Sequence, residues 1–240
     1  LTRFYIERIK RYDEQLKSVI TLTEDLAIKQ AIRADQEIAA GRYRGILHGI
    51  PYGVKDLIAV PGYPTSWGAA PYANQVVDQT AYVVRRLEEQ GAVLVAKLVS
   101  GELARGDVWF GGQTKNPWDL SQGASGSSAG SGAATSAGLV AFAIGTETLG
   151  SITSPATRTG VTGLRPTYGR ISRQGVMSLS WSMDKIGPLA RSAEDCELVF
   201  SALYGKDPKD PSTNDVPYNH VGKAPTALKV AYLKADIEDD

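Results

Sequence analysis

The stretch SQGASGSSAGSGAATSAG, residues 121–138, consists almost wholly of glycine, serine, alanine and threonine. Such a composition is typical of a flexible linker. Here, however, the stretch lies between two apolar segments that predict strands, AVLVAKL (92–98) and LVAFAIG (139–145). Small side chains in such a place let a helix pack close to a sheet, or let the backbone approach a ligand. We therefore interpret the stretch as part of the folded core rather than as a spacer.

The composition predicts an ordinary globular protein. The chain has 240 residues, of which 42% are hydrophobic, enough for one large domain or two small ones. Its 26 basic side chains balance 26 acidic ones, so bulk charge indicates neither a nucleic-acid partner nor a membrane surface. No apolar run approaches the roughly 18 residues of a membrane span. The opening at Leu1, with an amphipathic pattern instead of a signal peptide, predicts that the natural N-terminus is missing, which leaves targeting open. The location that we expect is cytoplasmic.

Residues 1–41 are predicted to form an N-terminal helical segment. Apolar residues recur at helical spacing in the first part, namely Phe4, Ile6, Ile9, Tyr12 and Leu16. A second helix is predicted over 24–40, with Thr21 and Glu24 as a capping box and Gly41 as the stop.

Helices and strands alternate through the predicted core, residues 42–204. DQTAYVVRRLEEQ (78–90) is helical in pattern, Gly91 ends it, and a buried strand follows. SAEDCELVFSALYG (192–205) predicts a helix capped by Ser192. Residues 205–226 read as a polar, proline-rich connection, and ALKVAYL (227–233) predicts a further strand. This alternation predicts an α/β fold around a mostly parallel or mixed sheet.

Cofactor and metal chemistry find little support in the sequence. The single cysteine, Cys196, cannot form an internal disulfide, which indicates a reducing compartment. It lies in a helical pattern, where we expect it to be a small buried residue rather than a nucleophile. Two histidines and one cysteine do not predict a zinc site. GSGAAT (130–135) lacks the third glycine of a dinucleotide loop, and no phosphate-binding loop ending in Gly-Lys-Ser/Thr occurs. We expect neither a cofactor nor a metal.

Two kinds of serine hydrolase can be derived from the residues alone. Residues 126–130 match G-x-S-x-G, which would make Ser128 a nucleophile paired with the only downstream histidine, His220. That histidine falls in the polar connection, and the pattern is easily met in so serine-rich a stretch. A lysine can replace histidine as the base when burial favours its neutral amine. Lys55, in YGVKDLIAV (52–60), has apolar neighbours; the pattern equally allows it to reach solvent from a strand end.

Five longer motifs resemble the amidase signature family: LHGIPYGVKD (47–56), TKNPWDLSQGASGSSAGSGAA (114–134), AIGTETLGSITSPA (143–156), GVTGLRPTYGRIS (160–172) and MDKIGPLARSAED (183–195). The similarity covers most of residues 1–235. It implies a single domain over 1–240, with a mixed sheet covered by helices on both faces. Family domains are about twice as long, so the resemblance also implies that this chain is the N-terminal, truncated part.

The resemblance assigns three catalytic residues. Lys55 corresponds to the family's base, Ser127 to its bridging serine and Ser151 to its nucleophile. The peptide bond before Ser127 is expected to be cis. Ser128 is expected to support the site by hydrogen bonding, with capping of the following helix as the alternative.

The family's oxyanion hole corresponds to four backbone N–H groups, those of Thr148, Leu149, Gly150 and Ser151. The sequence departs from the family here, because a glycine is usual where Leu149 stands and an aspartate where Glu147 stands. A leucine disfavours positive φ, and we expect its side chain to crowd the acyl pocket.

Two further departures concern charge near the nucleophile. Thr153 replaces a frequent arginine, and Arg158 stands where an apolar residue is common. Arg158 either supplies the missing charge or is an ordinary surface residue, and the sequence favours neither.

The function that the resemblance implies is hydrolysis of a small-molecule carboxylic amide, with esters and carbamates as related substrates, through an acyl-Ser151 intermediate. The alternative is the glutaminase subunit of a tRNA-dependent amidotransferase, which hands ammonia to a partner subunit. The expected partners are accordingly a homo-oligomer or, in the alternative, other subunits, without direct nucleic-acid or membrane contact. A catalytically silent binding module is disfavoured, because all three catalytic residues are present.

Overall fold

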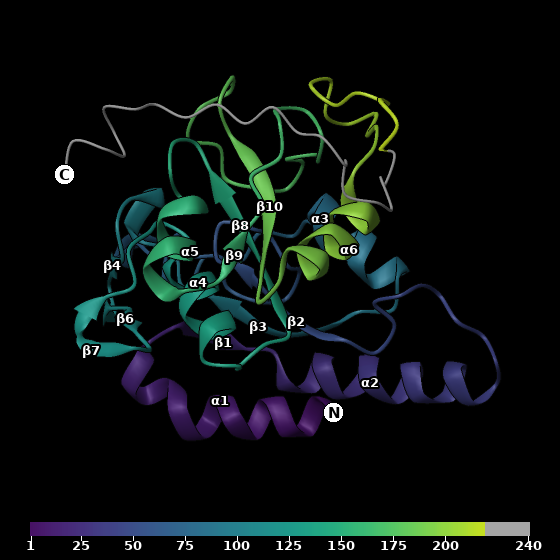
Figure 1. Cartoon of the computed structure of the whole chain (residues 1–240), viewed down its shortest axis with the longest axis horizontal. Helices are drawn as coiled ribbons and strands as arrows, with labels where there is room; N and C mark the ends of the chain where they lie inside the picture. Colours follow the sequence, from purple (N-terminus) through teal and green to yellow (C-terminus); the bar gives the residue numbers. More distant parts are fainter. Residues whose placement is uncertain (219–240) are drawn as a thin grey trace, which may run out of the picture.

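The computed structural model describes residues 1–218, and its centre is a mixed sheet (Figure 1). Within these residues the sheet has six strands in the order β1-β3-β2-β8-β10-β9. Strand β2 is parallel to β3 and β8, and the outer pairings are antiparallel. The bounds are β1 Val19–Leu22, β2 Pro51–Lys55, β3 Val93–Leu98, β8 Phe142–Glu147, β9 Thr162–Gly163 and β10 Lys185–Ala190. The predicted α/β class with a mixed sheet is confirmed.

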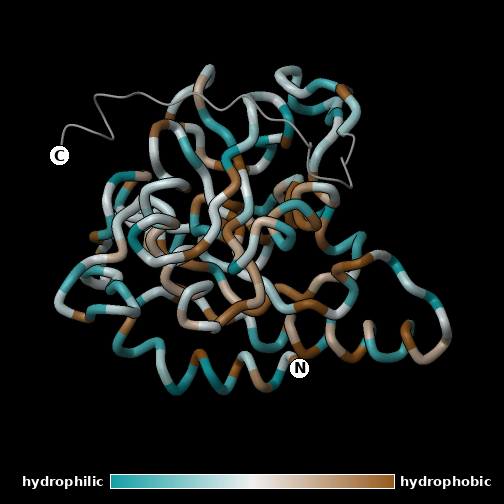
Figure 2. Tube along the Cα trace, viewed as in Figure 1, coloured by the Kyte–Doolittle hydropathy of each residue, from teal (hydrophilic) through white to brown (hydrophobic). Residues whose placement is uncertain are grey.

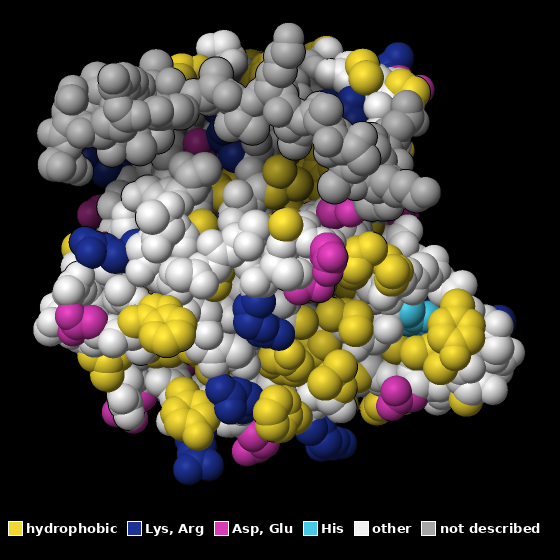
Figure 3. Space-filling view, viewed as in Figure 1, with side chains coloured by type: hydrophobic (Ala, Val, Ile, Leu, Met, Phe, Trp, Pro, Cys, Tyr) yellow, Lys and Arg dark blue, Asp and Glu magenta, His cyan; other side chains and the backbone are white. Residues whose placement is uncertain are grey.

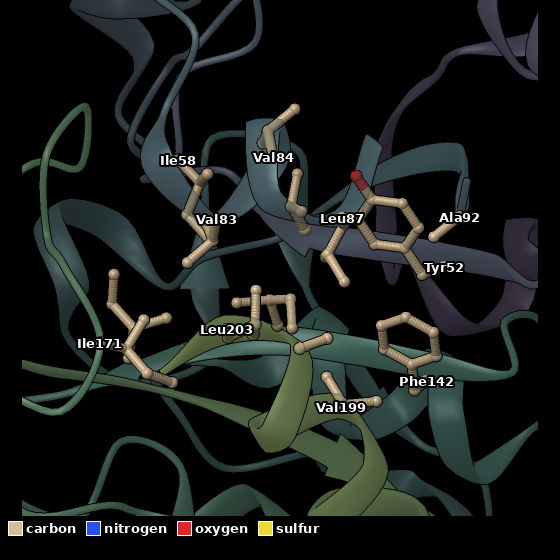
Figure 4. Close-up of a cluster of buried hydrophobic side chains, with 14 of the residues drawn as sticks. Tyr52, Ile58, Val83, Val84, Leu87, Ala92, Phe142, Ile171, Val199 and Leu203 are labelled. Atoms are coloured by element: carbon tan, nitrogen blue, oxygen red, sulfur yellow. The ribbon is translucent and has the colours of Figure 1, made fainter. Parts of the chain in front are cut away.

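Helices cover both faces of this sheet. One hydrophobic cluster joins strands β2 and β8 to helices α3 and α6, and Figure 4 shows Tyr52 and Phe142 beside side chains of these helices. A second cluster joins β3 and β8 to the N-terminal helices α1 and α2, which lie along one side in Figure 1. The helices are α1 Thr2–Leu16, α2 Glu24–Ala39, α3 Tyr82–Glu89, α4 Ala129–Ser136, α5 Thr153–Thr159 and α6 Ala193–Leu203.

Two short hairpins and two 3-10 turns lie outside the main sheet. Strands β4 Val108–Trp109 and β5 Gly112–Gln113 pair with each other, as do β6 Lys115–Asn116 and β7 Asp119–Gly123. The 3-10 turns are η1 Ala70–Tyr72 and η2 Glu102–Ala104. Along the chain, hydrophobic residues concentrate in the central elements and polar ones in the outer turns (Figure 2). On the face drawn in Figure 3, basic and acidic side chains are interspersed.

The serine-glycine stretch forms helix α4, as its small residues indicated. Seven of the helix's residues, Ala129 to Thr135, are buried. A Cβ atom at Gly130 would lie 2.3 Å from the main-chain oxygen of Ser18 and from the nitrogen of Val99, so only glycine permits this approach. The stretch is therefore a closely packed part of the core and not a linker.

Several local predictions are confirmed. Helix α6 begins after Ser192, whose hydroxyl accepts a hydrogen bond from the Asp195 N–H at 3.0 Å. Gly41 and Gly91 both follow helix ends with positive φ. Cys196 is 2% exposed and its thiol pKa is raised to about 11 by burial, which fits the predicted structural role.

Other local predictions are wrong. Helix α2 begins at Glu24 after Thr23, so Thr21 forms no capping box; Thr21 instead lies in strand β1, which the sequence analysis did not predict. The Thr23 hydroxyl donates to the Leu94 carbonyl at 2.7 Å and so serves the sheet rather than the helix. The helix of 78–90 is shorter than predicted and begins at Tyr82. The strand predicted at 227–233 lies outside the described residues.

Candidate active site

Lys55 is the last residue of β2, and its side chain is wholly buried, with 0% exposed. Its Nζ lies 2.7 Å from the Ser127 Oγ and 2.9 Å from the Thr146 Oγ1, with the Thr146 carbonyl oxygen at 3.5 Å. The sequence left open whether Lys55 reaches solvent. It does not: the strand directs the amine inward, towards two hydroxyl groups.

The surroundings of this amine favour its neutral form. Burial lowers the pKa of Lys55 to about 7, because removing an ammonium ion from water is costly. The negative charges of Asp184 and Glu147 oppose this shift. Near neutral pH a large fraction of the amine is therefore unprotonated, and a neutral amine can accept a proton from a hydroxyl.

Ser127 lies in the loop before α4, and the Gly126–Ser127 peptide bond is cis, as expected. A Cβ atom at Gly126 would lie 1.9 Å from the carbonyl oxygen of Gly106, so the residue before Ser127 must be glycine. The Ser127 carbonyl accepts a hydrogen bond from the Gly101 N–H at 3.1 Å. Both contacts hold the loop against the 101–106 segment.

Ser128 supports β8 and does not cap α4. Its hydroxyl donates to the Thr146 carbonyl at 3.1 Å and accepts from the Thr146 N–H at 3.2 Å, and it makes no side-chain cap. Ser128 thereby holds Thr146, whose own hydroxyl contacts Lys55. Thr146 was missed by the sequence analysis, because it meets Lys55 only through the pairing of β2 with β8, 91 residues further along the chain.

Ser151 lies in the turn between β8 and α5, and the carboxylate of Glu147 organises that turn. One carboxylate oxygen accepts hydrogen bonds from the N–H groups of Ile152 at 2.8 Å and Thr153 at 2.9 Å. Burial alone would raise the pKa of Glu147, but these bonds and one from the Gly150 N–H outweigh it, so the pKa is lowered. The other carboxylate oxygen lies 3.6 Å from Nε of Arg165.

Ser127 and Ser151 line the same cavity of about 300 Å³, together with Thr146 and Thr148. The backbone links their loops, since the Ser128 N–H donates to the Ser151 carbonyl at 3.1 Å. Among the described residues, the side-chain hydrogen bonds connect Lys55 with Ser127 but do not extend to the Ser151 hydroxyl. The structure thus brings Ser127 and Ser151 to one cavity and places the buried amine of Lys55 in direct contact with Ser127.

The four predicted oxyanion-hole residues form the turn that carries Ser151. Gly150 has a φ of 86°, so the residue that needs glycine is Gly150 and not its neighbour. Leu149 does not have positive φ, its side chain is 84% exposed, and it is not among the residues that line the cavity. The expectation that Leu149 crowds the acyl pocket is therefore wrong, because the turn directs this side chain outward.

Thr153 and Arg158, the two departures from the family that concern charge, have different surroundings in the structure. The Thr153 hydroxyl lies 3.2 Å from the Glu147 carboxylate and helps to hold the turn. Arg158 donates to the Gln122 side chain at 2.9 Å and is not among the residues that line the cavity. Of the two alternatives, Arg158 is thus a surface residue, and Arg165 is the arginine near Glu147.

The cavity also has walls that the sequence analysis did not assign. Asp184, 9% exposed, accepts hydrogen bonds from Thr148 Oγ1 at 2.5 Å and from the N–H groups of Leu179 and Ser180. Residues 209–211 of the polar connection line the cavity too, and Asp210 lies 3.6 Å from Nε of Arg173. His220 and residues 219–226 of the connection lie outside the described residues.

Metal-binding and membrane-spanning features are absent from the part of the chain that the structure describes. Within residues 1–218, no group of three or more histidine, cysteine, aspartate or glutamate side chains could hold a metal ion. None of the helices found there is both long and apolar enough to cross a bilayer.

The chain is similar to known amidases and amidotransferase subunits. The family model described as Amidase matches residues 1–240. The A subunit of glutamyl-tRNA(Gln) amidotransferase from Pseudomonas aeruginosa is 45% identical over 220 residues, covering 90% of this chain and 45% of the relative. The native peptide amidase of Stenotrophomonas maltophilia, a solved structure, is 41% identical with a TM-score of 0.84, covering 93% of this chain and 47% of that one.

A second solved structure, the glutamyl-tRNA(Gln) amidotransferase A subunit of Thermotoga maritima, has a TM-score of 0.79 at 32% identity, covering 90% of this chain and 46% of that one. The chain belongs to the amidase signature family. It spans about half the length of the curated relatives it matches. The family acts on carbon–nitrogen bonds, as hydrolases or amidotransferases.

Proposed function

We propose that the protein containing this chain hydrolyses a carboxylic amide through an acyl-enzyme on Ser151, with Lys55 as general base and Ser127 as the relay between them. One observation carries the proposal: a wholly buried amine lies 2.7 Å from the Ser127 hydroxyl, in the wall of the cavity that Ser151 also lines. A lysine becomes a useful base only when burial favours its neutral form, and the pKa of Lys55 is lowered to about 7 by burial.

The reaction follows from these groups. The Ser151 oxygen attacks the amide carbonyl carbon while its proton passes to Ser127, and the Ser127 proton passes to Lys55. When the tetrahedral intermediate collapses, the C–N bond breaks and the same relay delivers a proton to the departing nitrogen. Water then attacks the acyl ester, giving the carboxylic acid and restoring the Ser151 hydroxyl. The base, relay and nucleophile are all side chains of this chain, so this mechanism needs no metal or organic cofactor.

The negative oxygen of that intermediate requires fixed donors. We propose the backbone N–H groups of Thr148, Leu149 and Ser151 for this role. The Gly150 N–H, the fourth predicted donor, already interacts with the Glu147 carboxylate. Loss of one such donor typically raises the barrier by about 2.7–4 kcal/mol. Glu147 is then a positioning residue, because it holds the turn in which these donors lie.

The test is adduct formation on the complete protein. A fluorophosphonate should add to one serine, and peptide mass mapping should find it at Ser151. Ser151→Ala should abolish both the adduct and amide turnover, whereas Ser154→Ala, an exposed serine three residues away, should abolish neither. An adduct on Ser128, with activity lost in His220→Ala, would replace this mechanism with the histidine-dependent one.

A second candidate function, the glutaminase subunit of a tRNA-dependent amidotransferase, is favoured by the names of the relatives. In that case ammonia released from glutamine would pass to a partner subunit. Glutamine as the only efficient substrate, together with co-purification of a second subunit, would favour this candidate. Turnover of varied amides by the isolated protein would favour the free-standing amidase.

We further propose a cytoplasmic location. The only cysteine of the sequence, Cys196, is a free buried thiol, which is compatible with a reducing compartment.

A further inference from the structure

The loop before β10 forms a wall of the cavity and is fixed from two sides. On one side, the Asp184 carboxylate accepts hydrogen bonds from the N–H groups of Leu179 at 2.7 Å and Ser180 at 2.9 Å. On the other side, the Trp181 carbonyl accepts from the Tyr168 hydroxyl at 2.6 Å and from Arg173 at 2.7 Å. The main chain at Trp181 is therefore held in place without help from the indole ring.

The indole ring itself is left uncovered at the cavity. Trp181 lines the cavity, yet 84% of the residue is exposed to solvent. Leu179, also in the lining, is 54% exposed. Large apolar side chains with this exposure at a concave site mark a surface that binds an apolar group.

Two more exposed apolar residues flank the same wall. Leu149 is 84% and Met183 42% exposed. They neighbour Thr148 and Asp184, whose side chains are hydrogen-bonded at 2.5 Å, so the turn carrying Ser151 and the loop carrying Trp181 are joined. Leu149 and Met183 are not among the residues that line the cavity, so we call Leu179 and Trp181 alone the apolar rim. Deeper in the cavity the lining continues with apolar residues, including Leu57, Val176 and Ile186.

The charged residues of the cavity wall are mostly committed to partners in the protein. Arg173 lies 3.6 Å from the Asp210 carboxylate and also donates to the Trp181 carbonyl. Lys185 donates to the Thr148 carbonyl at 3.0 Å. Lys209 is the remaining basic residue of the described lining, and it is exposed. An apolar acyl group thus finds more complementary surface here than a small charged one does.

We propose that the apolar rim, with Trp181 as its main contact, selects amides whose acyl group carries an aromatic or branched aliphatic substituent. This inference rests on the proposed amidase function and specifies its substrate class. The acyl group stays on Ser151 after the C–N bond breaks, so a rim on the loop that is hydrogen-bonded to the Ser151 turn contacts it in both halves of the reaction.

Three primary amides test the proposal, because they differ only in the acyl group: acetamide, phenylacetamide and L-glutamine. With the complete protein, kcat/KM should be highest for phenylacetamide. Trp181→Ala should lower the ratio of kcat/KM for phenylacetamide to that for acetamide by about tenfold, mainly through KM, since an aromatic contact is lost. Trp181→Phe should retain most of the ratio. Trp118→Ala, which changes a tryptophan that is 76% exposed on the β6–β7 hairpin, should leave the ratio unchanged.

The outcomes distinguish a failure of the rim proposal from a failure of the proposed amidase function. If the protein hydrolyses none of the three amides and takes up no fluorophosphonate at Ser151, the proposed function fails and the rim proposal with it. If amides are hydrolysed but Trp181→Ala leaves the ratio unchanged, only the rim proposal fails. Preference for glutamine, lost in Lys209→Ala, would likewise overturn it, because the cavity would then select a charged acyl group.

Discussion

Two lysines with wholly buried side chains lie on neighbouring strands, and their surroundings differ in one respect. Lys97, on β3, has its Nζ 2.7 Å from a carboxylate oxygen of Asp56. Lys55, on β2, has only hydroxyl and carbonyl oxygens as hydrogen-bond partners among residues 1–218. Burial lowers the pKa of both, but only for Lys97 does an adjacent carboxylate oppose the shift by direct contact. A buried lysine with a counter-ion serves structure, whereas one without a counter-ion is suited to accept a proton.

The difference between the two lysines is tested most directly by removing each amine in turn. Lys55→Met should lower kcat for an amide about 10²- to 10⁴-fold, the range that a general base contributes. Its thermal unfolding should not be destabilised, because methionine fills the same buried space without a charge. Unchanged kcat in this variant would show that the proton goes elsewhere.

The matching change at the other lysine should affect stability more than chemistry. Lys97→Met leaves the Asp56 carboxylate buried without its cation, so the free energy of unfolding should fall by about 3–5 kcal/mol. Urea denaturation would measure this loss. The double variant Asp56→Asn, Lys97→Met should recover part of it; equal stability of the single and double variants would show that the ion pair does not matter.

The pH profile of activity should follow Lys55. Its pKa is about 7, and the base works only when neutral, so kcat/KM should rise with pH through about 7 and level off above. Below that value the ammonium form predominates and activity should fall about tenfold per pH unit. Measuring kcat/KM against pH with an uncharged amide would check this. A rise of kcat/KM centred near pH 10.5, the ordinary pKa of lysine, would contradict a buried, neutral base.

The smallest expected effect concerns Thr146, whose hydroxyl contacts the Lys55 amine. Thr146→Val removes a hydroxyl that stabilises the ammonium form, so the acid limb of kcat/KM should shift to lower pH. The loss of one hydrogen bond should lower the free energy of unfolding by about 1 kcal/mol. Thr146→Ser, which keeps the hydroxyl, should return the acid limb of kcat/KM to the pH of the unchanged protein. An acid limb that stays at the same pH in Thr146→Val would show that the Thr146 hydroxyl does not influence the pKa of Lys55.

Much of the fold could be predicted because its signals are local. Gly91 ends a helix before a buried strand, and Ser192 caps α6, since caps and periodicity act over a few residues. Strand β1 was missed because four residues between two helices carry too short a pattern, and its pairing with β3 is a long-range contact. The capping box at Thr21 failed for the same reason: sheet pairing overrode a local preference.

The sequence by itself determined the family and which residue types are candidates, because the motifs around Lys55, Ser127 and Ser151 are long and ordered. Only the tertiary structure decided what surrounds them. Lys55 meets Ser127 and Thr146 across separations of 72 and 91 residues, and Leu149 turns outward instead of into the cavity. The pKa of Lys55 depends on how many atoms exclude water from its amine. That quantity comes from packing between distant segments, and no short stretch of sequence encodes it.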